Sequence, residues 1–417
     1  MISYEEAINK IQLASEPISS HKLALQKTLG YMSAKEVRSP IEIPQFHNSA
    51  MDGFAIRSED LQEDEGSEPV SFQVVGHVKA GDAISSPAVV KKNTTYSIMT
   101  GAPIPRGYDT VVRVEDVTQK KNDQQVEISI NKIISCGENI RRAGEDFSIA
   151  DVILRPGMMI TPSHIMALAA VGISEVTVKK IPNVAVFCTG DELLSDVSQS
   201  MKSGMIYNSN GPYIQSLLPS FNANLCHYEV LSDCKEGFIN KMNELLESHS
   251  PPDVILTSGG VSVGEYDFIP KALEEMGADV IFHKVRIRPG KPVLFAKINQ
   301  CFILGLPGNP VSTAVGLRFF LYPLLRNILM MGAETSVKAK LINSAKTNGD
   351  LLYFYKAVLS TNSDGQSNVE VLSGQESFKI KPLIRANCWA VSNAIKGGFT
   401  SGEIIDVYPF YPGMNRS

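Results

Sequence analysis

Four segments in the second half of the chain place glycines beside hydroxyl or charged side chains, directly after short apolar runs. The segments are CTGDELL, TSGGVSVGEYDF, HKVRIRPGKP and GLPGNPVSTAV. Glycine-rich turns at strand ends expose consecutive backbone N–H groups, which bind phosphate and other oxyanions. The sequence therefore predicts a site for a phosphate-bearing or oxyanionic substrate, built where several strands end.

The first segment presents two adjacent carboxylates, Asp191 and Glu192, after Gly190. Two interpretations are equally open at this point. The pair can act on a substrate, or it can cap a helix and complement the dipole of its first turn.

The second and fourth segments are the best candidates for anion-binding loops. Ser258, Gly259 and Gly260 can form a nest of backbone N–H groups, to which Ser262 adds a hydroxyl, and Asp267 follows in the same loop. A plain glycine turn is the alternative. In the fourth segment, Asn309 and Pro310 suit the N-cap and first position of a helix, and Gly308 permits close approach to a ligand. Helix capping alone would explain Asn309 and Pro310, but it explains LPG less well.

The third segment concentrates positive charge in a chain whose net charge is −5. Alternation along K-V-R-I-R predicts that Lys284, Arg286 and Arg288 share one strand face, and the turn at Pro289-Gly290 presents Lys291. Like charges on one face repel unless an anion lies there. A solvated basic strand is the alternative.

Three further segments lie in the N-terminal half. FHNSAMDGFA carries Asp52 on a turn, IMTGAPIP carries Thr100 at a strand end, and ENIRRAGEDF carries Asp146. Taken singly, each is explained as turn chemistry or surface charge.

The elements that position these segments follow from periodicity. A capped helix is expected over residues 3–14, and short strands dominate to about residue 155. The run PSHIMALAAVG is expected to be a short helix that ends at Gly172. Strands alternate with helices from residue 183, which indicates a parallel sheet with crossover helices. Strands of a separate β domain follow after about residue 330. The chain is therefore expected to be a multidomain α/β protein.

Composition limits the function further. The chain has 417 residues, 43% hydrophobic and 20% charged, so two to four domains are expected. Its acidic balance argues against a nucleic-acid partner. The six cysteines form no C-x-x-C pair, which argues against a thiolate zinc site or a disulfide framework. The polar, acidic N-terminus is not a signal peptide, and the apolar stretch 311–331 contains charges and a proline, so we expect a cytoplasmic protein with no membrane span.

Several motifs occur in a characteristic order along the chain. They are SAMDGFA, IMTGAP, NIRRAGED, TGDEL, YNSNG, SGGVSVGEYDF, RPGKP and GLPGNPVS. In content and order they resemble the molybdopterin molybdenumtransferases, the family that inserts molybdate into adenylylated molybdopterin and includes the E domain of gephyrin. The resemblance covers essentially the whole chain.

The resemblance implies four domains and a homodimer. It implies an elongated N-terminal domain of residues 1–40 and 142–178, a β-rich insertion of 41–141, a three-layer α/β/α molybdopterin-binding domain of 179–326, and a β-barrel-like domain of 327–417. The family's active sites form between subunits.

The resemblance also implies roles for individual residues. The matching catalytic positions are Asp52, Thr100, Asp146, Glu192 and Asp267. The matching substrate-binding positions are Ser258, Gly259, Gly260, Ser262, Lys284, Arg288, Lys291, Gly308 and Asn309. Oxygen ligands for Mg²⁺ would come from Asp191, Glu192, Asn208 and Asp267. Three positions depart from the family pattern: Asn208 stands where Asp is common, Arg288 where Lys is frequent, and Glu376 where Gly is common.

The implied reaction uses Mg²⁺ and molybdate, consumes adenylylated molybdopterin and releases AMP. An upstream molybdopterin adenylyltransferase would supply the adenylylated pterin. Two alternatives stay open: a molybdopterin adenylyltransferase, and a non-catalytic scaffold of the gephyrin E-domain type. The first lacks the MDGFA region and the C-terminal barrel, and the retained charged residues argue against the second.

Overall fold

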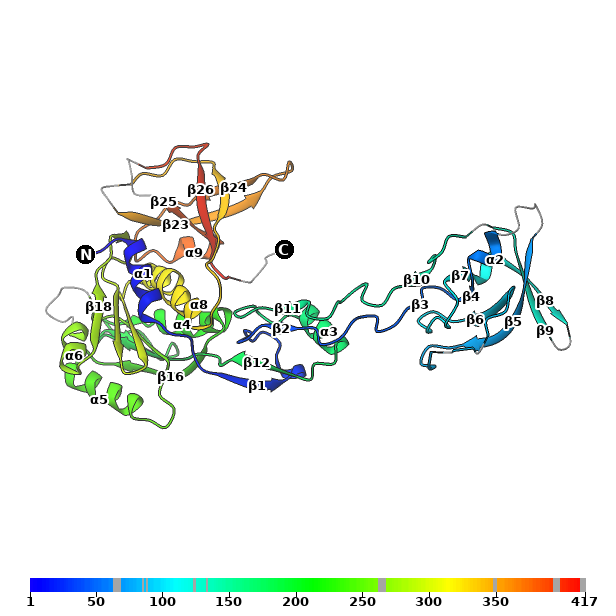
Figure 1. The fold of residues 1–417 in the computed structure, drawn as a ribbon. Helices are drawn as coiled ribbons and strands as arrows, with labels where there is room; N and C mark the ends of the chain where they lie inside the picture. Colours follow the sequence, from blue (N-terminus) through cyan, green and yellow to red (C-terminus); the bar gives the residue numbers. More distant parts are fainter. Residues whose placement is uncertain are drawn as a thin grey trace.

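The protein is elongated, with a large body at one end, a small β-rich lobe at the other, and a thin arm between them (Figure 1). The computed structural model describes residues 1–62, 69–84, 86–87, 89–122, 125–132, 134–261, 268–347, 351–392 and 398–412. Within this part of the chain, no helix is long and apolar enough to cross a membrane.

The arm is made of short antiparallel strand pairs that join the N-terminal segment to residues beyond 140. The pairs are β1 (Ser20–Ala24) with β12 (Glu175–Lys179), β2 (Val37–Arg38) with β11 (Val152–Leu154), and β3 (Asn48–Ser49) with β10 (Ile140–Arg141). The 3₁₀ turn η1 (Leu25–Lys27) and helix α3 (Pro162–Ala170) pack beside them. These pairings bring together two distant segments, which the strand pattern alone did not predict.

Helix α3 shows how local sequence sets the ends of an element. Thr161 caps it, and its hydroxyl accepts the N–H of His164, while Pro162 fits the first turn. Gly172 has a φ of +78° and donates its N–H to the carbonyl of Ala169. Glycine at this left-handed position ends the helix as the sequence predicts.

The distal lobe is a six-stranded sheet in the order β7-β4-β6-β5-β9-β8. Its elements are β4 (Gly53–Ile56), α2 (Glu59–Gln62), β5 (Val70–Val78), β6 (Thr94–Ile98), β7 (Thr110–Arg113), η2 (Val114–Asp116), β8 (Val117–Asn122) and β9 (Gln125–Ile130). Phe54, Phe72 and Ile128 belong to a small core of its own. The expected β-rich insertion is therefore present.

The large body contains a six-stranded sheet in the order β16-β13-β17-β21-β20-β18. Its strands are β13 (Asn183–Thr189), β16 (Asn224–Leu231), β17 (Val254–Ser258), β18 (Asp279–His283), β20 (Leu294–Ile298) and β21 (Cys301–Leu306). The first four in that order run parallel, and β20 is antiparallel to both of its neighbours. The carboxyl ends of β13, β17 and β21 therefore meet at one edge.

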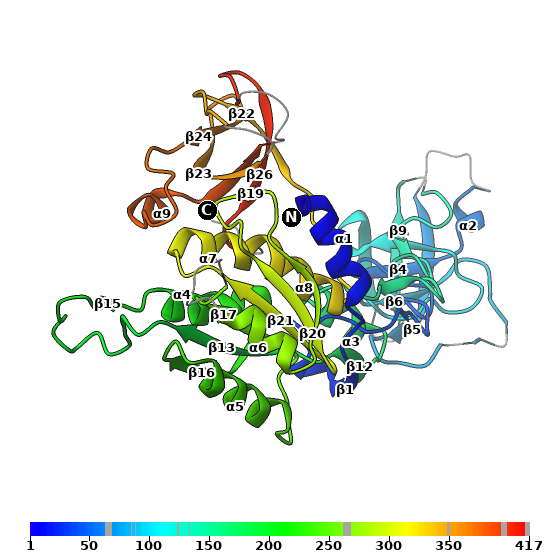
Figure 2. The same cartoon turned by 90° about the vertical axis from the view of Figure 1, so that its left-hand side faces the viewer.

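Helices cover both faces of this sheet, which confirms the expected three-layer arrangement (Figure 2). One face carries α5 (Lys235–Leu246) and α6 (Ile269–Glu275). The other carries α1 (Tyr4–Ala14), α4 (Asn210–Leu217) with η3 (Leu218–Phe221), and the helical run of α7 (Pro310–Gly316), the π-turn η4 (Leu317–Leu321) and α8 (Tyr322–Ile328).

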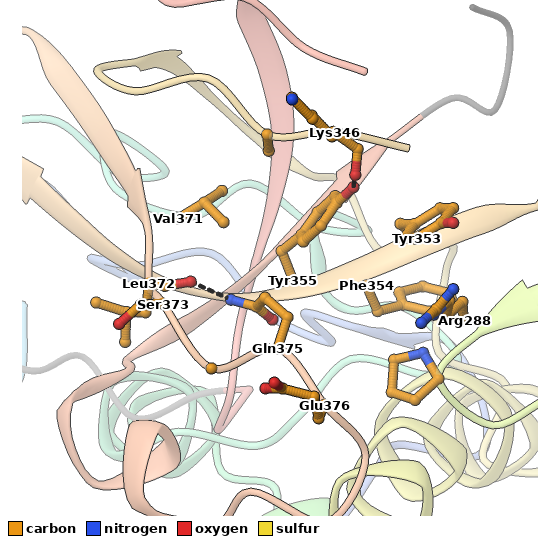
Figure 3. Close-up of a pocket in the computed structure, with 13 residues that line it drawn as sticks. Arg288, Lys346, Tyr353, Phe354, Tyr355, Val371, Leu372, Ser373, Gln375 and Glu376 are labelled. Carbon is orange, nitrogen blue, oxygen red and sulfur yellow. Dashed lines mark hydrogen bonds between the residues drawn. The ribbon is translucent and has the colours of Figure 1, made fainter. Parts of the chain in front are cut away.

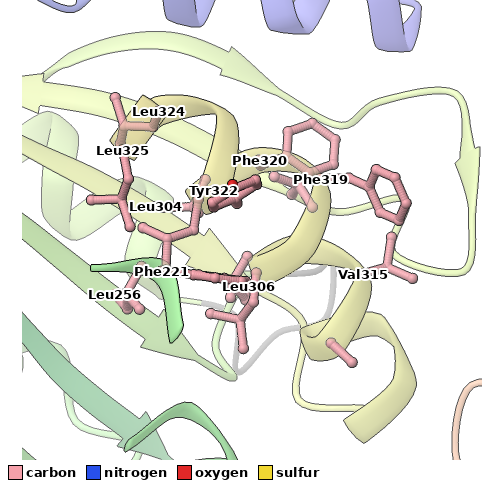
Figure 4. Packing of buried hydrophobic residues seen from close by; sticks show 14 of the residues in the cluster. Phe221, Leu256, Leu304, Leu306, Val315, Phe319, Phe320, Tyr322, Leu324 and Leu325 are labelled. Carbon is pink, nitrogen blue, oxygen red and sulfur yellow. The ribbon is translucent and has the colours of Figure 1, made fainter. Parts of the chain in front are cut away.

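The run from α7 to α8 fills the main core (Figure 4). Phe320 and Leu325 are fully buried against Leu256 and Leu304 of the sheet. Truncating a buried phenylalanine such as Phe320 to Ala costs about 3–5 kcal/mol. The apolar stretch that begins at residue 311 is therefore buried helix as far as Ile328.

Helix α1 lies against α8, with Ala7 and Ile11 in the main core. The segment 1–40 expected for the arm domain thus begins with a helix that packs on the α/β body. The residue boundaries of the four domains stay a prediction.

The C-terminal strands form a sheet that closes through an additional pairing of β23 with β25, as the expected barrel requires. The elements are β22 (Val337–Leu341), β23 (Leu352–Thr361), β24 (Ser367–Val371), α9 (Lys381–Arg385), β25 (Cys388–Ser392) and β26 (Ile404–Pro409). Strand β19 (Ile287–Arg288) extends from the α/β domain to pair with β23.

A buried arginine fastens the barrel to the α/β domain. Arg318 of η4 is 2% exposed, forms an ion pair of 2.6 Å with Glu334, and donates from Nε to the carbonyl of Pro409 at 2.8 Å. Its guanidinium also lies 5.1 Å from the ring centre of Tyr322 and 5.6 Å from that of Tyr408. One side chain thus joins the helical run, the segment that leads out of it, and the last strand.

Candidate active site

The loops after β17 and β21 approach each other closely. Gly259 has a φ of +106°, and its N–H bonds to the carbonyl of Leu306 at 3.0 Å. A Cβ at Gly259 would lie 2.6 Å from the carbonyl oxygen of Thr189, and one at Gly308 would lie 3.7 Å from the Cα of Gly259. Only glycine at position 259 therefore permits this assembly of strand ends.

Asn210, which was not predicted as a site residue, holds these loops together. Its side-chain nitrogen lies 2.9 Å from Ser258 Oγ, 2.7 Å from the carbonyl of Gly308 and 3.2 Å from Thr313 Oγ1. The residue is almost fully buried at the start of α4. In the sequence, the signal for Asn210 was its place in the motif YNSNG, where α4 begins.

Two adjacent cavities flank the turn at Gly308 and Asn309. The first has a volume of about 570 Å³ and is lined by Glu192, Asn208 and Ser258. The second, of about 490 Å³, is lined by Gly260, Arg288 and Lys291. The turn and Phe378 belong to both. The structure therefore brings most of the predicted substrate-binding residues around one turn.

Asn309 occupies the N-cap position of α7, as expected. In the described part of the chain, its side chain makes no capping hydrogen bond to α7, although it precedes Pro310. The side chain is exposed at the junction of the two cavities. A ligand can therefore use its amide.

The prediction of one continuous basic strand is wrong. Strand β18 ends at His283, and Lys284 adopts a left-handed backbone with a φ of +73°. Alternation resumes only beyond it, with Val285 and Ile287 buried and Arg286 and Arg288 exposed. The backbone N–H of Lys284 bonds to the carbonyl of Val293, which holds this turn in place. His283 ends β18, and its Nε2 lies 2.9 Å from the carbonyl oxygen of Val261.

A third cavity of about 460 Å³ opens beside the second, in the barrel (Figure 3). Arg288 and Glu376 line both the second and the third. The guanidinium of Arg288 lies 5.9 Å from the ring centre of Tyr353, which holds it at the junction of the two domains.

Three carboxylates gather after β13 and β16. Asp191 Oδ1 accepts the backbone N–H of Asp233 at 3.2 Å. Burial, and next the charges of Asp191 and Glu192, raise the pKa of Asp233. Asp233 was not predicted, although it follows a strand parallel to β13 and so belongs to the same edge of the sheet.

Hard oxygen donors at this edge suit Mg²⁺, which takes one or two carboxylates plus substrate phosphates. Among the described residues, no three His, Cys, Asp or Glu side chains lie close enough to hold a metal ion by themselves. Asn208 is buried, accepts the N–H of Gly211 at 3.0 Å and donates to Tyr228 Oη at 2.9 Å. It therefore has a structural role at the start of α4, and its role as a metal ligand stays a prediction.

Asp52 and Thr100 meet at the ends of β4 and β6 in the distal lobe. Asp52 Oδ1 accepts the backbone N–H of Thr100 at 2.7 Å and its hydroxyl at 2.9 Å. These two hydrogen bonds, the backbone bond first, lower the pKa of Asp52. The lobe lies at the far end of the arm from the cavities (Figure 1), so one chain does not bring this carboxylate to the anion-binding loops.

Asp146 lies exposed on the arm, where its backbone N–H bonds to the carbonyl of Ile43. Ser262 and Asp267 lie outside the described residues. The catalytic and metal-binding roles of the residues predicted above stay predictions.

The fold and the cavities define a multidomain protein with a central α/β domain of molybdopterin-binding type. Three family models match in succession: "MoeA N-terminal region (domain I and II)" over residues 2–172, "Probable molybdopterin binding domain" over 185–327, and "MoeA C-terminal region (domain IV)" over 338–410. The chain belongs to the MoeA family of molybdenum cofactor biosynthesis, whose curated relatives are named molybdopterin molybdenumtransferase.

Individual relatives match along nearly their whole length. The molybdopterin molybdenumtransferase of Staphylococcus aureus (strain MSSA476) is 34% identical over 97% of this chain and 95% of its own. That of Synechococcus elongatus is 35% identical over 98% and 99%. The solved molybdopterin biosynthesis moea protein from Pyrococcus horikosii covers 98% of this chain and 99% of its own at 26% identity, with a TM-score of 0.82.

Proposed function

We propose that this chain inserts molybdenum from molybdate into adenylylated molybdopterin, releasing AMP and giving molybdenum cofactor. The observation that carries the proposal is the pair of cavities around Gly308 and Asn309, one with carboxylate and hydroxyl groups and one with Arg288 and Lys291. Such a division suits a substrate that has a phosphoanhydride between two larger parts.

The residues around the second cavity would bind and orient the substrate anions. Molybdate is a dianion that approaches a substrate carrying a pyrophosphate linkage, so positive charge must offset their repulsion. Arg288 and Lys291 supply that charge, and the backbone at Gly260 and Gly308 lets the phosphates approach. Positioning of the two anions would be the main contribution to the rate.

Mg²⁺ would be held by Asp191 and Glu192, with Asp233 beside them, and when bound it would polarise the phosphoanhydride. The remaining roles fall to side chains of the protein. Ser258 and Asn309 would bind the substrate in the first cavity, and the cavity walls would shield from water the dithiolene sulfurs that capture molybdenum.

The site would be completed by a second copy of the chain. Asp52 is held ionised by Thr100 on a lobe that its own cavities cannot reach, so a homodimer would bring the lobe of one copy to the α/β loops of the other. The reaction would take place in the cytoplasm, with the adenylylated pterin delivered by a molybdopterin adenylyltransferase.

The test is incubation of the purified protein with adenylylated molybdopterin, molybdate and Mg²⁺, followed by measurement of AMP and of reconstituted apo-molybdoenzyme. Molybdate-dependent AMP release with reconstitution is expected. The matched variants are Arg288→Ala, which removes a cavity cation, and Lys340→Ala on an exposed strand position of the barrel. The first is expected to lower activity by about 100-fold and the second to leave it unchanged. ATP-dependent adenylylation of molybdopterin, or no AMP release at all, would contradict the proposal.

A further inference from the structure

Lys356 is a fully buried lysine in β23, on the barrel wall beside the cavities. A buried ammonium is unfavourable unless hydrogen bonds replace its water. Its Nζ donates to the carbonyl oxygens of Gly374, Glu376 and Lys379, at 2.7, 3.3 and 3.1 Å. All its hydrogen-bonding capacity as an ammonium is thus directed to one loop.

That loop, residues 373–379, is held a second time by Gln375. The side-chain oxygen of Gln375 accepts the backbone N–H of Lys356 at 3.0 Å, and its nitrogen donates to the carbonyls of Lys356 and Leu372 at 2.9 and 2.7 Å (Figure 3 shows the last bond). Lys356 therefore holds the loop in two ways: its side chain binds the carbonyls of Gly374, Glu376 and Lys379, and its backbone binds the side chain of Gln375.

The loop forms the common wall of the three cavities. Gln375 and Glu376 line the second and third, and Phe378 lines the first and second. The carbonyl of Ser377 accepts the backbone N–H of Val311, in the first turn of α7, at 3.0 Å. The loop therefore connects the barrel to the anion-binding turn of the α/β domain.

We propose that Lys356 is a positioning residue: its ammonium gathers the carbonyls of loop 373–379 and thereby sets the loop against α7, closing the cavity that binds the substrate anion. It does not touch the substrate. The part that concerns the anion rests on the proposed function, whereas the part that concerns the loop does not.

Burial lowers the pKa of Lys356 to about 8, with the charge of Glu376 opposing this shift and that of Lys379 adding to it. If the side chain at position 356 only filled space in the barrel, methionine or leucine would fill it without the cost of burying a charge. The Lys356 ammonium donates hydrogen bonds to three carbonyl oxygens, which methionine or leucine could not do.

The test compares Lys356→Met, which keeps the length of the side chain, with Lys356→Arg, which keeps the charge, and with the exposed control Lys340→Met. Folding of the barrel is checked by the fluorescence of the single tryptophan, Trp389, which is buried directly opposite Lys356 on β25. If Lys356→Met does not fold, Gln375→Leu removes the other clamp without altering the strand.

Two measurements decide the outcome: hydrogen exchange at the Val311 amide, and binding of AMP as the probe anion. In Lys356→Met we expect faster exchange at Val311 and AMP binding weaker by about tenfold or more, with Lys356→Arg and Lys340→Met close to the parent. Unchanged Val311 exchange, or unchanged AMP binding in a variant whose loop is loosened, would overturn the proposal. A parent protein that binds no AMP would instead count against the proposed function, and Val311 exchange alone would then decide whether Lys356 positions the loop.

Discussion

Two acidic sites in this molecule shift the pKa of a carboxyl group in opposite directions. In the distal lobe, Asp52 is exposed and accepts two hydrogen bonds from Thr100, which lower its pKa. In the α/β domain, burial and the charges of two neighbouring acids raise the pKa of Asp233. Hydrogen bonding therefore favours the ionised form of Asp52, whereas burial and the neighbouring charges disfavour the ionised form of Asp233.

The difference suggests a division of labour. The Asp52 site is complete in itself and needs only to be brought to a substrate. In the proposed function, the site of Asp191, Glu192 and Asp233 would be completed by Mg²⁺, whose positive charge would offset the repulsion among the acids. Dimerisation would thus bring the Asp52 site to the substrate, whereas binding of a cation would complete the site in the α/β domain.

The largest expected effect comes from separating the two sites between chains. Asp52→Ala and Glu192→Ala are each expected to lower AMP release by about 100-fold or more. Mixing the two inactive variants after subunit exchange is expected to restore roughly a quarter of the parent activity, because half the dimers are mixed and each carries one intact site.

The control for this experiment is a mixture of Asp52→Ala with Asp52→Asn. Both changes lie in the lobe, so no intact site can form and activity should stay low. No recovery in the first mixture would break the comparison by placing both carboxylates in sites of the same chain. Recovery in the control would show that mixing restores activity without shared sites.

An effect of intermediate size is expected for Asp233→Asn. The folded-state pKa of Asp233 is raised, so the ionised group opposes folding above the ordinary Asp range, and that penalty disappears as the pH falls through the raised pKa. Without Mg²⁺ at neutral pH, the variant should therefore melt roughly 1–2 °C above the parent. Calorimetry at several pH values measures this.

Repeating the same calorimetry with added Mg²⁺ tests whether these carboxylates bind the ion. If the cluster holds the ion, added Mg²⁺ should stabilise the parent more than Asp233→Asn and abolish or reverse the difference. An equal response of both proteins would remove Asp233 from the cation site.

The smallest effect is expected for Thr100→Val. The change removes the hydroxyl donor to Asp52 but keeps the backbone N–H, so the pKa of Asp52 should rise and stay below its usual value. Any stability that the ionised carboxylate contributes is present above the ordinary Asp range and lost as the pH falls through the folded-state pKa, so the loss should be smaller and should be complete at higher pH in the variant. Carbon-detected NMR titration of the Asp52 carboxyl measures the shift, and an unchanged titration would contradict the hydrogen-bond explanation.

The sequence predicted well whatever depends on local pattern. The alternation of strands and helices beyond residue 183, the capped helix before Gly172 and the glycine at position 259 follow from periodicity and backbone freedom, which are local properties. The three-layer arrangement follows because buried parallel strands need helices on both faces.

What the sequence could not show depends on contacts between distant segments. Asn210 and Lys356 are ordinary polar residues until folding surrounds them with acceptors, and nothing in their immediate neighbours reveals those acceptors. Lys284 was misplaced because alternation of residue types does not report a left-handed backbone. The packing of α1 on α8, rather than in the arm, is likewise decided by tertiary contacts.

The buried contact of Arg318 with Glu334 and Pro409 has a consequence for motion. It locks the barrel to the α/β domain, so the walls of the three cavities should move as one unit. Next to the lobe, the arm is held by the two-residue strands β3 and β10, which offer little resistance to bending. Substrate entry and product release should therefore depend on swinging of the lobe about the arm, and the cavities themselves should keep a fixed shape throughout the catalytic cycle.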